Sequence, residues 1–104
     1  MVDRTLKFTN TAWEDYLCWQ GQDKKTLRRI NDLLQATLRA PFEGMGKPEP
    51  LCGNLSGLWS RRIDQEHRLV YEVTQGAMSI VACRYHYSNH EAQAIKSRPG
   101  CPVR

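Results

Sequence analysis

The residues best suited to chemistry stand together as Arg84-Tyr85-His86-Tyr87, directly after the strand-like run Met78–Cys83. A guanidinium can bind phosphate through paired hydrogen bonds, and phenol rings can stack on bases. An imidazole can transfer a proton near neutral pH, because the reference pKa of histidine is about 6.5. Together these residues can bind phosphate, stack on bases and transfer a proton near neutral pH, and the question is whether the cluster performs chemistry or only ends the strand.

A loop rich in proline and glycine, residues 42–51, offers a carboxylate for such a site. Pro48 and Pro50 flank Glu49, and a residue that precedes proline favours an extended backbone. A loop of this length is commonly functional, since ordering it costs conformational entropy. We therefore expect Glu49 to be presented on a stiff backbone, as a preorganised site requires.

The elements that must position these groups follow from hydrophobic periodicity. Short turns connect the last three strands, which predicts an antiparallel meander. The predicted class is α+β, in the order β-α-α-β-β-β, with two N-terminal helices on one face of an antiparallel sheet. The predicted elements are a strand at Thr5–Thr9, a helix that begins after a cap at Asn10 or Thr11 and ends at Gly21, a helix at Lys24–Arg39 capped by Asp23, and strands at Leu58–Ile63, Arg68–Thr74 and Met78–Tyr87.

Side chains alternate along a strand, so the pattern predicts which residues share a face. Ile80, Ala82, Arg84 and His86 are expected on one face of the last strand, with Val81, Cys83, Tyr85 and Tyr87 on the other. Leu69, Tyr71 and Val73 form the better core face of the preceding strand, which sends Arg68 to the opposite side. Arg62 joins Arg68 there only if the hairpin between them has an odd loop such as Asp64–Glu66, because a two-residue loop would separate them.

The length, net charge and cysteine spacing indicate what kind of protein this is. The 104 residues indicate one domain, 1–87, followed by a tail, 88–104, that we expect to be mobile. The net charge of +4 favours an anionic partner, either nucleic acid or an acidic protein. No apolar run is long enough for a membrane span, and the charged start does not look like a signal peptide, so a cytoplasmic location is expected. The four cysteines match no disulfide pattern and are expected to be reduced thiols.

Other interpretations of the same residues stay open at this point. Arginine and histidine on strands often face solvent without a role. The aromatic residues Trp13 and Trp19 are expected to be packing anchors rather than a base-stacking pair. Cys83, His86 and His90 have zinc-like spacing, but no second ligand pair follows them, and we expect no metal.

Four strings, in this order along the chain, resemble the YoeB toxins of the RelE/ParE superfamily. The strings are PFEGMGKPEPL at 41–51, NLSGLWSRRI at 54–63, EHRLVY at 66–71 and ACRYHY at 82–87, and the stretch WEDYL at 13–17 adds to them. The resemblance covers about residues 6–87. It implies a microbial-RNase-like (RelE/ParE) fold and a ribosome-dependent mRNA endoribonuclease that is neutralised by a YefM-type antitoxin. Members of that family cut mRNA in the ribosomal A site and leave a 2′,3′-cyclic phosphate and a 5′-OH.

The resemblance also implies roles for particular residues. Glu49 matches the catalytic glutamate, Arg68 the central arginine and His86 the catalytic histidine, while Tyr87 matches the final tyrosine. In that scheme Glu49 takes the proton of the ribose 2′-OH, Arg68 holds the phosphoryl oxygens and His86 protonates the leaving 5′-oxygen. The residues expected to bind RNA or phosphate are Lys47, Arg62 and Arg84. No cofactor or metal takes part.

Two departures from the family pattern concern the site. Cys52-Gly53 stands where the family often has Lys-His, so one expected cation beside the site is missing. Close relatives end at the tyrosine that corresponds to Tyr87, whereas this chain continues to Arg104. The extra residues remove a terminal carboxylate from beside the site, and they could lie over it.

The expected partners are a YefM-like antitoxin, the ribosome and mRNA. An acidic antitoxin segment is expected over Arg62, Arg68 and Arg84, and the choice between homodimer and monomer stays open. One alternative function is a superfamily toxin that inhibits gyrase without nuclease activity, against which the presence of Glu49, Arg68 and His86 together argues. Another is a non-enzymatic RNA- or ribosome-binding module.

Overall fold

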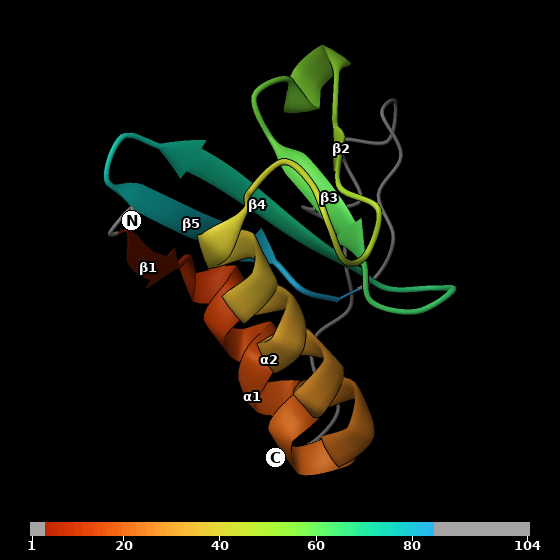
Figure 1. Cartoon of the computed structure of the whole chain (residues 1–104). Coiled ribbons are helices and arrows are strands. Elements are labelled where there is room, and N and C mark those ends of the chain that lie inside the picture. The colour runs from red at the N-terminus through yellow and green to blue at the C-terminus, as the bar shows by residue number, and fades with distance from the viewer. Residues whose placement is uncertain (1–3, 85–104) are drawn as a thin grey trace.

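The structure of this chain is a computed structural model that describes residues 4–84 (Figure 1). The predicted site residues His86 and Tyr87 and the predicted tail, 88–104, lie outside the described residues. Within residues 4–84, no helix is both long enough and apolar enough to cross a membrane.

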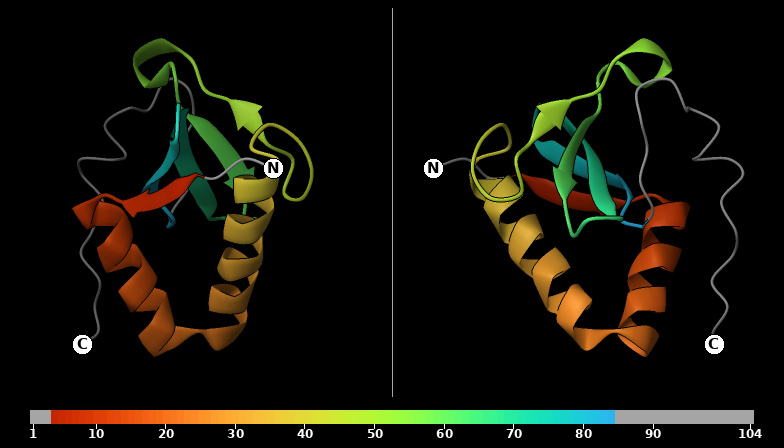
Figure 2. Two further views of the ribbon diagram at one scale, coloured as in Figure 1. Left: turned by 60° about the vertical axis from the view of Figure 1, so that its left-hand side comes forward. Right: turned by 90° about the vertical axis from the view of Figure 1, so that its right-hand side faces the viewer.

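Two helices and five strands make up the described part of the chain, and the predicted α+β class is confirmed. The elements are β1 (Thr5–Phe8), α1 (Asn10–Gln22), α2 (Lys24–Arg39), β2 (Glu49–Pro50), β3 (Trp59–Arg62), β4 (Arg68–Thr74) and β5 (Ala77–Ala82), with a short 3-10 helix, η1 (Gly53–Leu55), before β3. The strands form one sheet in the order β1-β5-β4-β3-β2. Both helices lie on the same face of this sheet (Figure 2).

A fully antiparallel sheet had been expected, but one pair of strands is parallel. β3, β4 and β5 form the predicted antiparallel meander, but β1 pairs with β5 in parallel, with Leu6 opposite Met78. A parallel pair needs a long crossover connection, and the helical hairpin with the rest of the sheet supplies it. The other difference is β2, a two-residue edge strand that pairs with β3 inside the predicted loop.

Side-chain caps set the ends of the helices. Asp23 caps α2 as predicted, and its carboxylate accepts hydrogen bonds from the backbone N–H groups of Lys25 and Thr26. The cap of α1 is Thr9, whose hydroxyl accepts a hydrogen bond from the Ala12 N–H. The expected cap at Asn10 or Thr11 is therefore wrong by one or two positions. The sequence could not separate three adjacent residues that are all good caps.

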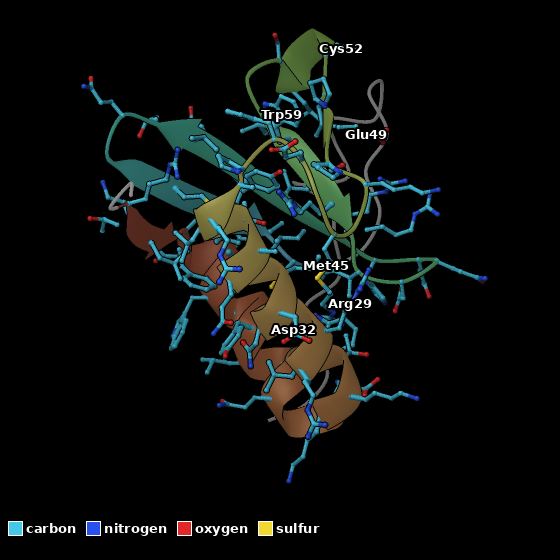
Figure 3. All side chains as sticks on the ribbon, viewed as in Figure 1. Arg29, Asp32, Met45, Glu49, Cys52 and Trp59 are labelled. Atoms are coloured by element: carbon cyan, nitrogen blue, oxygen red, sulfur yellow. The ribbon has the colours of Figure 1, made fainter. Side chains whose placement is uncertain are left out.

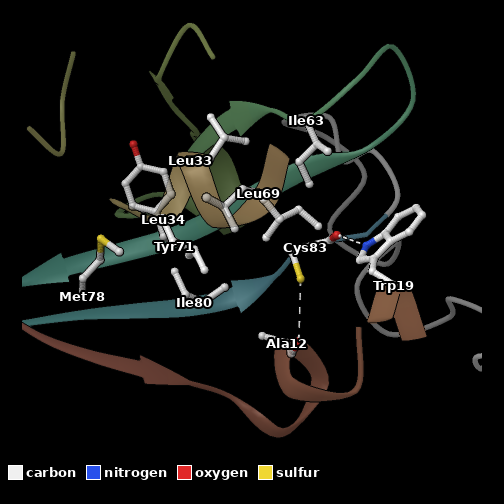
Figure 4. Packing of buried hydrophobic residues seen from close by; sticks show 11 residues of the cluster. Ala12, Trp19, Leu33, Leu34, Ile63, Leu69, Tyr71, Met78, Ile80 and Cys83 are labelled. Atoms are coloured by element: carbon white, nitrogen blue, oxygen red, sulfur yellow. Dashed lines mark hydrogen bonds between the residues drawn. The ribbon is translucent and has the colours of Figure 1, made fainter. Parts of the chain in front are cut away.

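The main core fills the space between the helices and the sheet (Figure 4). It includes the predicted inward residues of β4, Leu69 and Tyr71, which are fully buried. Trp19 is buried as expected, whereas Trp13 is 49% exposed and stacks on Tyr16. The residues of this core are Ala12, Trp19, Ile30, Leu33, Leu34, Ile63, Leu69, Tyr71, Met78, Ile80 and Cys83.

A second, smaller core lies on the opposite face of the sheet, where η1 folds over Val70 and Ala82. The alternation predicted for the last strand fails here. Tyr71 pairs with Ile80 and Val70 with Ala82, so Val81 is the extra residue of a β-bulge. Ile80 belongs to the helix-side core and Ala82 to the second core, although they were expected on one face. Val81 and Cys83, also expected to share a face, are separated for the same reason.

Candidate functional site

Strand β2 brings Glu49 to the edge of the sheet (Figure 3). Glu49 is opposite Ser60 of β3, and Ser60 is opposite Val70 of β4. Residues that are opposite each other in a ladder project to the same face. The predicted extended backbone at Glu49 is confirmed, and its side chain lies on the face of the sheet away from the helices.

Arg68 reaches Glu49 across the intervening strand. The Arg68 NH1 atom lies 3.3 Å from Oε2 of Glu49 and 3.4 Å from Oγ of Ser60. The side chains are 18% exposed for Arg68 and 58% exposed for Glu49. The guanidinium is thus partly shielded and held, while the carboxylate stays open to a ligand. A carboxylate beside a guanidinium can accept a proton from a ligand whose phosphate the guanidinium holds.

Arg62 lies on the same face as Arg68. The two arginines are directly opposite each other in the β3–β4 ladder. The Ile63 N–H donates to the His67 carbonyl, so the hairpin loop is Asp64–Glu66. This is the odd loop on which the prediction for Arg62 depended, and the condition is met. Two like charges that are opposite each other on an exposed face repel, and an anion between them would relieve that repulsion.

Lys47 precedes Pro48 and was expected to be extended, which is wrong. Its φ is +52°, the one left-handed value outside glycine in the described part of the chain. Left-handed backbone is costly for a residue with a side chain, and such strain clusters at functional sites. Lys47 is exposed and stands two residues before Glu49. Its position suits a mobile cation at the rim of the site.

Arg84 follows β5 and is 8% exposed. Of the three expected phosphate ligands it therefore offers less surface to a ligand than Arg62 or Lys47 does. The residue before it is fixed by α1. The Cys83 N–H donates to the Asp15 carboxylate at 3.0 Å, and the Trp19 indole N–H donates to the Cys83 carbonyl at 2.8 Å. These bonds fix the backbone of Cys83, the residue directly before Arg84.

The cysteines of the described part differ from the expectation in one case. Cys52 and Cys83 are thiols outside any disulfide. Cys18 is disulfide-bonded, so the expectation of reduced thiols is wrong there, because a fold can join cysteines whose spacing along the chain carries no pattern. Among residues 4–84 no group of His, Cys, Asp and Glu is arranged to hold a metal ion. Of the zinc-like set, only Cys83 is described, and its thiol points to the Ala12 carbonyl at 3.8 Å.

Arg61 is the residue near the site that the sequence analysis missed. It is fully buried on the helix side of β3, one residue from Arg62, and its guanidinium binds the loop that leads to Glu49. One signal could have found it. In the strand Trp59–Arg62, strict alternation with exposed Arg62 sends Arg61 to the core face, where an arginine needs several hydrogen-bond acceptors.

Comparisons with known proteins show the family of this chain. Residues 8–87 match the model of a family described as YoeB-like toxin of bacterial type II toxin-antitoxin system. The chain is similar to the toxin YoeB of Escherichia coli K12, with 58% identity over 82 residues that cover 79% of this chain and 98% of the relative.

Two solved structures from Staphylococcus aureus are similar to it as well. A YoeB dimer is 46% identical with a TM-score of 0.77, and a heterotetrameric YoeB–YefM toxin–antitoxin complex is 46% identical with a TM-score of 0.74. Each match covers 83% of this chain and 100% of the other chain.

Proposed function

This chain belongs to the YoeB-like toxins of bacterial type II toxin–antitoxin systems, and from that premise we propose that it is a ribosome-dependent mRNA endoribonuclease. The observation that supports this proposal is the pair of Glu49 and Arg68, held 3.3 Å apart on an accessible sheet face with Arg62 beside them. A base next to a phosphate-binding guanidinium is what cleavage of RNA by its own 2′-OH requires.

The reaction is a transesterification in which each residue has one role. Glu49 removes the proton from the ribose 2′-OH, and the 2′-oxygen bonds to phosphorus while the bond from phosphorus to the 5′-oxygen breaks. His86 gives its proton to the departing 5′-oxygen. Arg68 stabilises the charge that develops on the phosphoryl oxygens, and Tyr87 contacts the same group. The products are a 2′,3′-cyclic phosphate and a 5′-OH, and no metal takes part.

Binding of the RNA backbone falls to Lys47, Arg62 and Arg84. Lys47 and Arg62 are exposed and flank Glu49 and Arg68 from the loop and from β3. Dependence on the ribosome is proposed from the family resemblance, and it is physically sensible because an external scaffold that aligns the mRNA supplies the orientation of the reacting groups.

The test is to add purified protein to translating ribosomes and to map the new 5′ ends of the cut mRNA by primer extension. The wild type should produce cuts in the A site, and the Glu49→Ala, His86→Gln double variant should produce none. A Glu14→Gln variant, on the exposed side of α1, is the matched control and should cut like the wild type. Absence of A-site cuts by the wild type would leave a gyrase inhibitor or a non-enzymatic ribosome-binding module.

The proposed partner is a YefM-like antitoxin. The S. aureus relative is found in a YoeB–YefM heterotetramer and another structure of it is a dimer. We expect an acidic segment of the antitoxin to cover Arg62, Arg68 and Arg84, because complementary charge selects partners. Coexpression with the neighbouring small open reading frames should yield a complex that Arg62→Glu weakens. A homodimer is proposed for the protein without antitoxin, and light scattering measures it.

A further inference from the structure

We propose that Arg61 is a positioning residue for the candidate site, which it serves by fixing the loop that carries Lys47 and Glu49. The inference rests on the proposed function, since it explains how the proposed base is held. Arg61 lies on β3 with Arg62, but its side chain bonds to Tyr71 of the helix-side core, on the opposite face of the sheet. It touches neither Glu49 nor Arg68, so it acts through the backbone.

The guanidinium of Arg61 donates hydrogen bonds to carbonyl groups of the loop between α2 and β2. NH1 donates to the Met45 carbonyl at 2.9 Å, and NH2 donates to the Glu43 carbonyl at 3.0 Å. NH2 also donates to the carbonyl of Ala40, the residue that ends α2. Three carbonyls from a segment without regular structure thus converge on one side chain.

Tyr71 completes this arrangement from the neighbouring strand. The Nε atom of Arg61 donates to the Tyr71 hydroxyl at 3.1 Å, and that hydroxyl donates to the Pro41 carbonyl at 2.7 Å. Both side chains are fully buried. Four loop carbonyls, from Ala40, Pro41, Glu43 and Met45, are therefore held by two residues of the sheet.

A role in stability alone does not account for this use of a buried charge. Burying a guanidinium is costly, and an apolar residue of similar volume often serves a core equally well. No carboxylate forms an ion pair with Arg61 among the described residues. Its hydrogen bonds go to three carbonyl groups and to the Tyr71 hydroxyl. Because the three carbonyls belong to the loop, the geometry that Arg61 fixes is the geometry of that loop.

Strand β2 cannot hold Glu49 by itself. It has only two residues, and the second, Pro50, has no N–H to donate. After Pro50, the Leu51 N–H donates to the Leu58 carbonyl at 2.9 Å. Before Glu49, the Arg62 N–H donates to the Gly46 carbonyl at 2.7 Å, one residue beyond the carbonyl of Met45 that Arg61 holds. Without the Arg61 side chain, the segment before Glu49 would lose the bonds to Met45 and Glu43 and would keep this bond between the Arg62 N–H and the Gly46 carbonyl.

The test compares Arg61→Met and Tyr71→Phe with Met78→Ala. Met78 is fully buried in the same core but lies in β5 opposite β1, away from the loop, so it controls for lost stability. Tyr71→Phe removes one hydroxyl and keeps the ring, which secures a folded variant if Arg61→Met does not fold. A displacement near 1 Å costs about 100-fold in rate. Arg61→Met should therefore lower the rate of mRNA cleavage at saturating toxin by about 100-fold, and Tyr71→Phe should lower it less.

Two readouts separate positioning from a loss of folding. The toxin concentration that gives half-maximal cleavage should stay within about twofold of wild type, because only orientation at the reacting atoms changes. Hydrogen exchange of the Arg62 amide and of residues 42–47 should accelerate in Arg61→Met and Tyr71→Phe but not in Met78→Ala. Hydrogen exchange does not depend on nuclease activity. If the wild type cuts no mRNA, the proposed function is overturned, but the exchange measurement still tests whether Arg61 fixes the loop. The inference is overturned if loop exchange is unchanged, or if Met78→Ala loses cleavage rate to the same extent.

Discussion

Oε2 of Glu49 and NH1 of Arg68 lie 3.3 Å apart although a whole strand separates the two residues in the sheet. Glu49 belongs to the edge strand β2 and Arg68 begins β4, and the arginine side chain crosses β3 above Ser60. The pair therefore depends on the register of three strands at once. Any slip of β2 against β3 by one residue would turn the carboxylate to the other face.

Breaking this pair should separate activity from stability. Glu49→Gln should lower the cleavage rate by about 100-fold or more, because the general base is lost. The same change should alter the free energy of unfolding by less than about 1 kcal/mol, since the carboxylate is more than half exposed and solvent screens the pair. Urea unfolding measures the second quantity and primer extension on ribosomes the first. Equal cleavage by Glu49→Gln and by the Glu14→Gln control would contradict the assignment.

Gly46→Ala should disturb the site loop, and Gly76→Ala is its matched control. Both glycines have left-handed backbone, with φ of +84° and +83°, so both variants carry the same conformational penalty. A Cβ at Gly46 would meet Cδ2 of Leu33 at 2.9 Å and Cβ of Arg61 at 3.1 Å, whereas nothing lies within 4 Å at Gly76. We expect Gly46→Ala to cost about 1–3 kcal/mol more than Gly76→Ala, the range for overpacking. Equal midpoints of urea unfolding would show that the loop yields to the added methyl group.

The sequence was sufficient for the parts of the fold that rest on local chemistry. Asp23 can be recognised as a cap because a carboxylate stands directly before an amphipathic run. The antiparallel meander of β3, β4 and β5 follows from the short turns between alternating strands, although the loop length that pairs Arg62 with Arg68 was left open. These features depend on residues that are close in sequence, so the rules for helix caps and tight turns are enough to predict them.

The parts that the sequence did not give depend on contacts between distant segments. The parallel pairing of β1 with β5, the bulge at Val81 and the strand β2 are set by how the sheet closes on its core. Glu49, Arg68 and Arg62 were selected by residue type and family resemblance, and the structure places them together. Strand alternation could have placed Arg61 on the core face, but three of its four acceptors are backbone carbonyls, which carry no signature in the sequence.

Trp19→Phe should lower the free energy of unfolding, because it removes one hydrogen bond to the residue that follows β5. The change removes the indole N–H and leaves the buried Cys83 carbonyl without that donor (Figure 4). An unsatisfied buried polar group costs about 1–3 kcal/mol. Trp59→Phe removes a similar ring area, and the indole nitrogen of Trp59 donates to no protein group within residues 4–84, so the comparison isolates the hydrogen bond. Urea unfolding of both variants measures the difference, and equal stability would mean that water replaces the lost donor.

Cys52→Lys should strengthen binding to programmed ribosomes. Cys52 is exposed beside η1, at the position where the family pattern often has lysine. One more cation near Glu49 adds one phosphate contact, and each such contact steepens the dependence of binding on salt by about 0.7 for single-stranded RNA. Binding measured from about 50 to about 300 mM salt should therefore show a steeper slope of log affinity against log salt concentration for Cys52→Lys than for the wild type. Cys52→Ser controls for loss of the thiol, and a slope unchanged in Cys52→Lys would place this position outside the RNA path.

The stability of the wild type should fall at alkaline pH in a way that Tyr71→Phe does not share. Burial raises the pKa of the Tyr71 hydroxyl above its ordinary value of 10.0, and the nearby Arg61 guanidinium lowers it by a smaller amount. Because the folded pKa lies above the unfolded one, the stabilising contribution is complete below about pH 10 and is lost as pH rises through the folded pKa. Phenylalanine does not titrate, so the difference in free energy of unfolding between wild type and Tyr71→Phe should shrink above that pH. Urea unfolding at a series of pH values measures it, and a difference that stays constant above about pH 10 would show that folding does not raise the pKa of the Tyr71 hydroxyl.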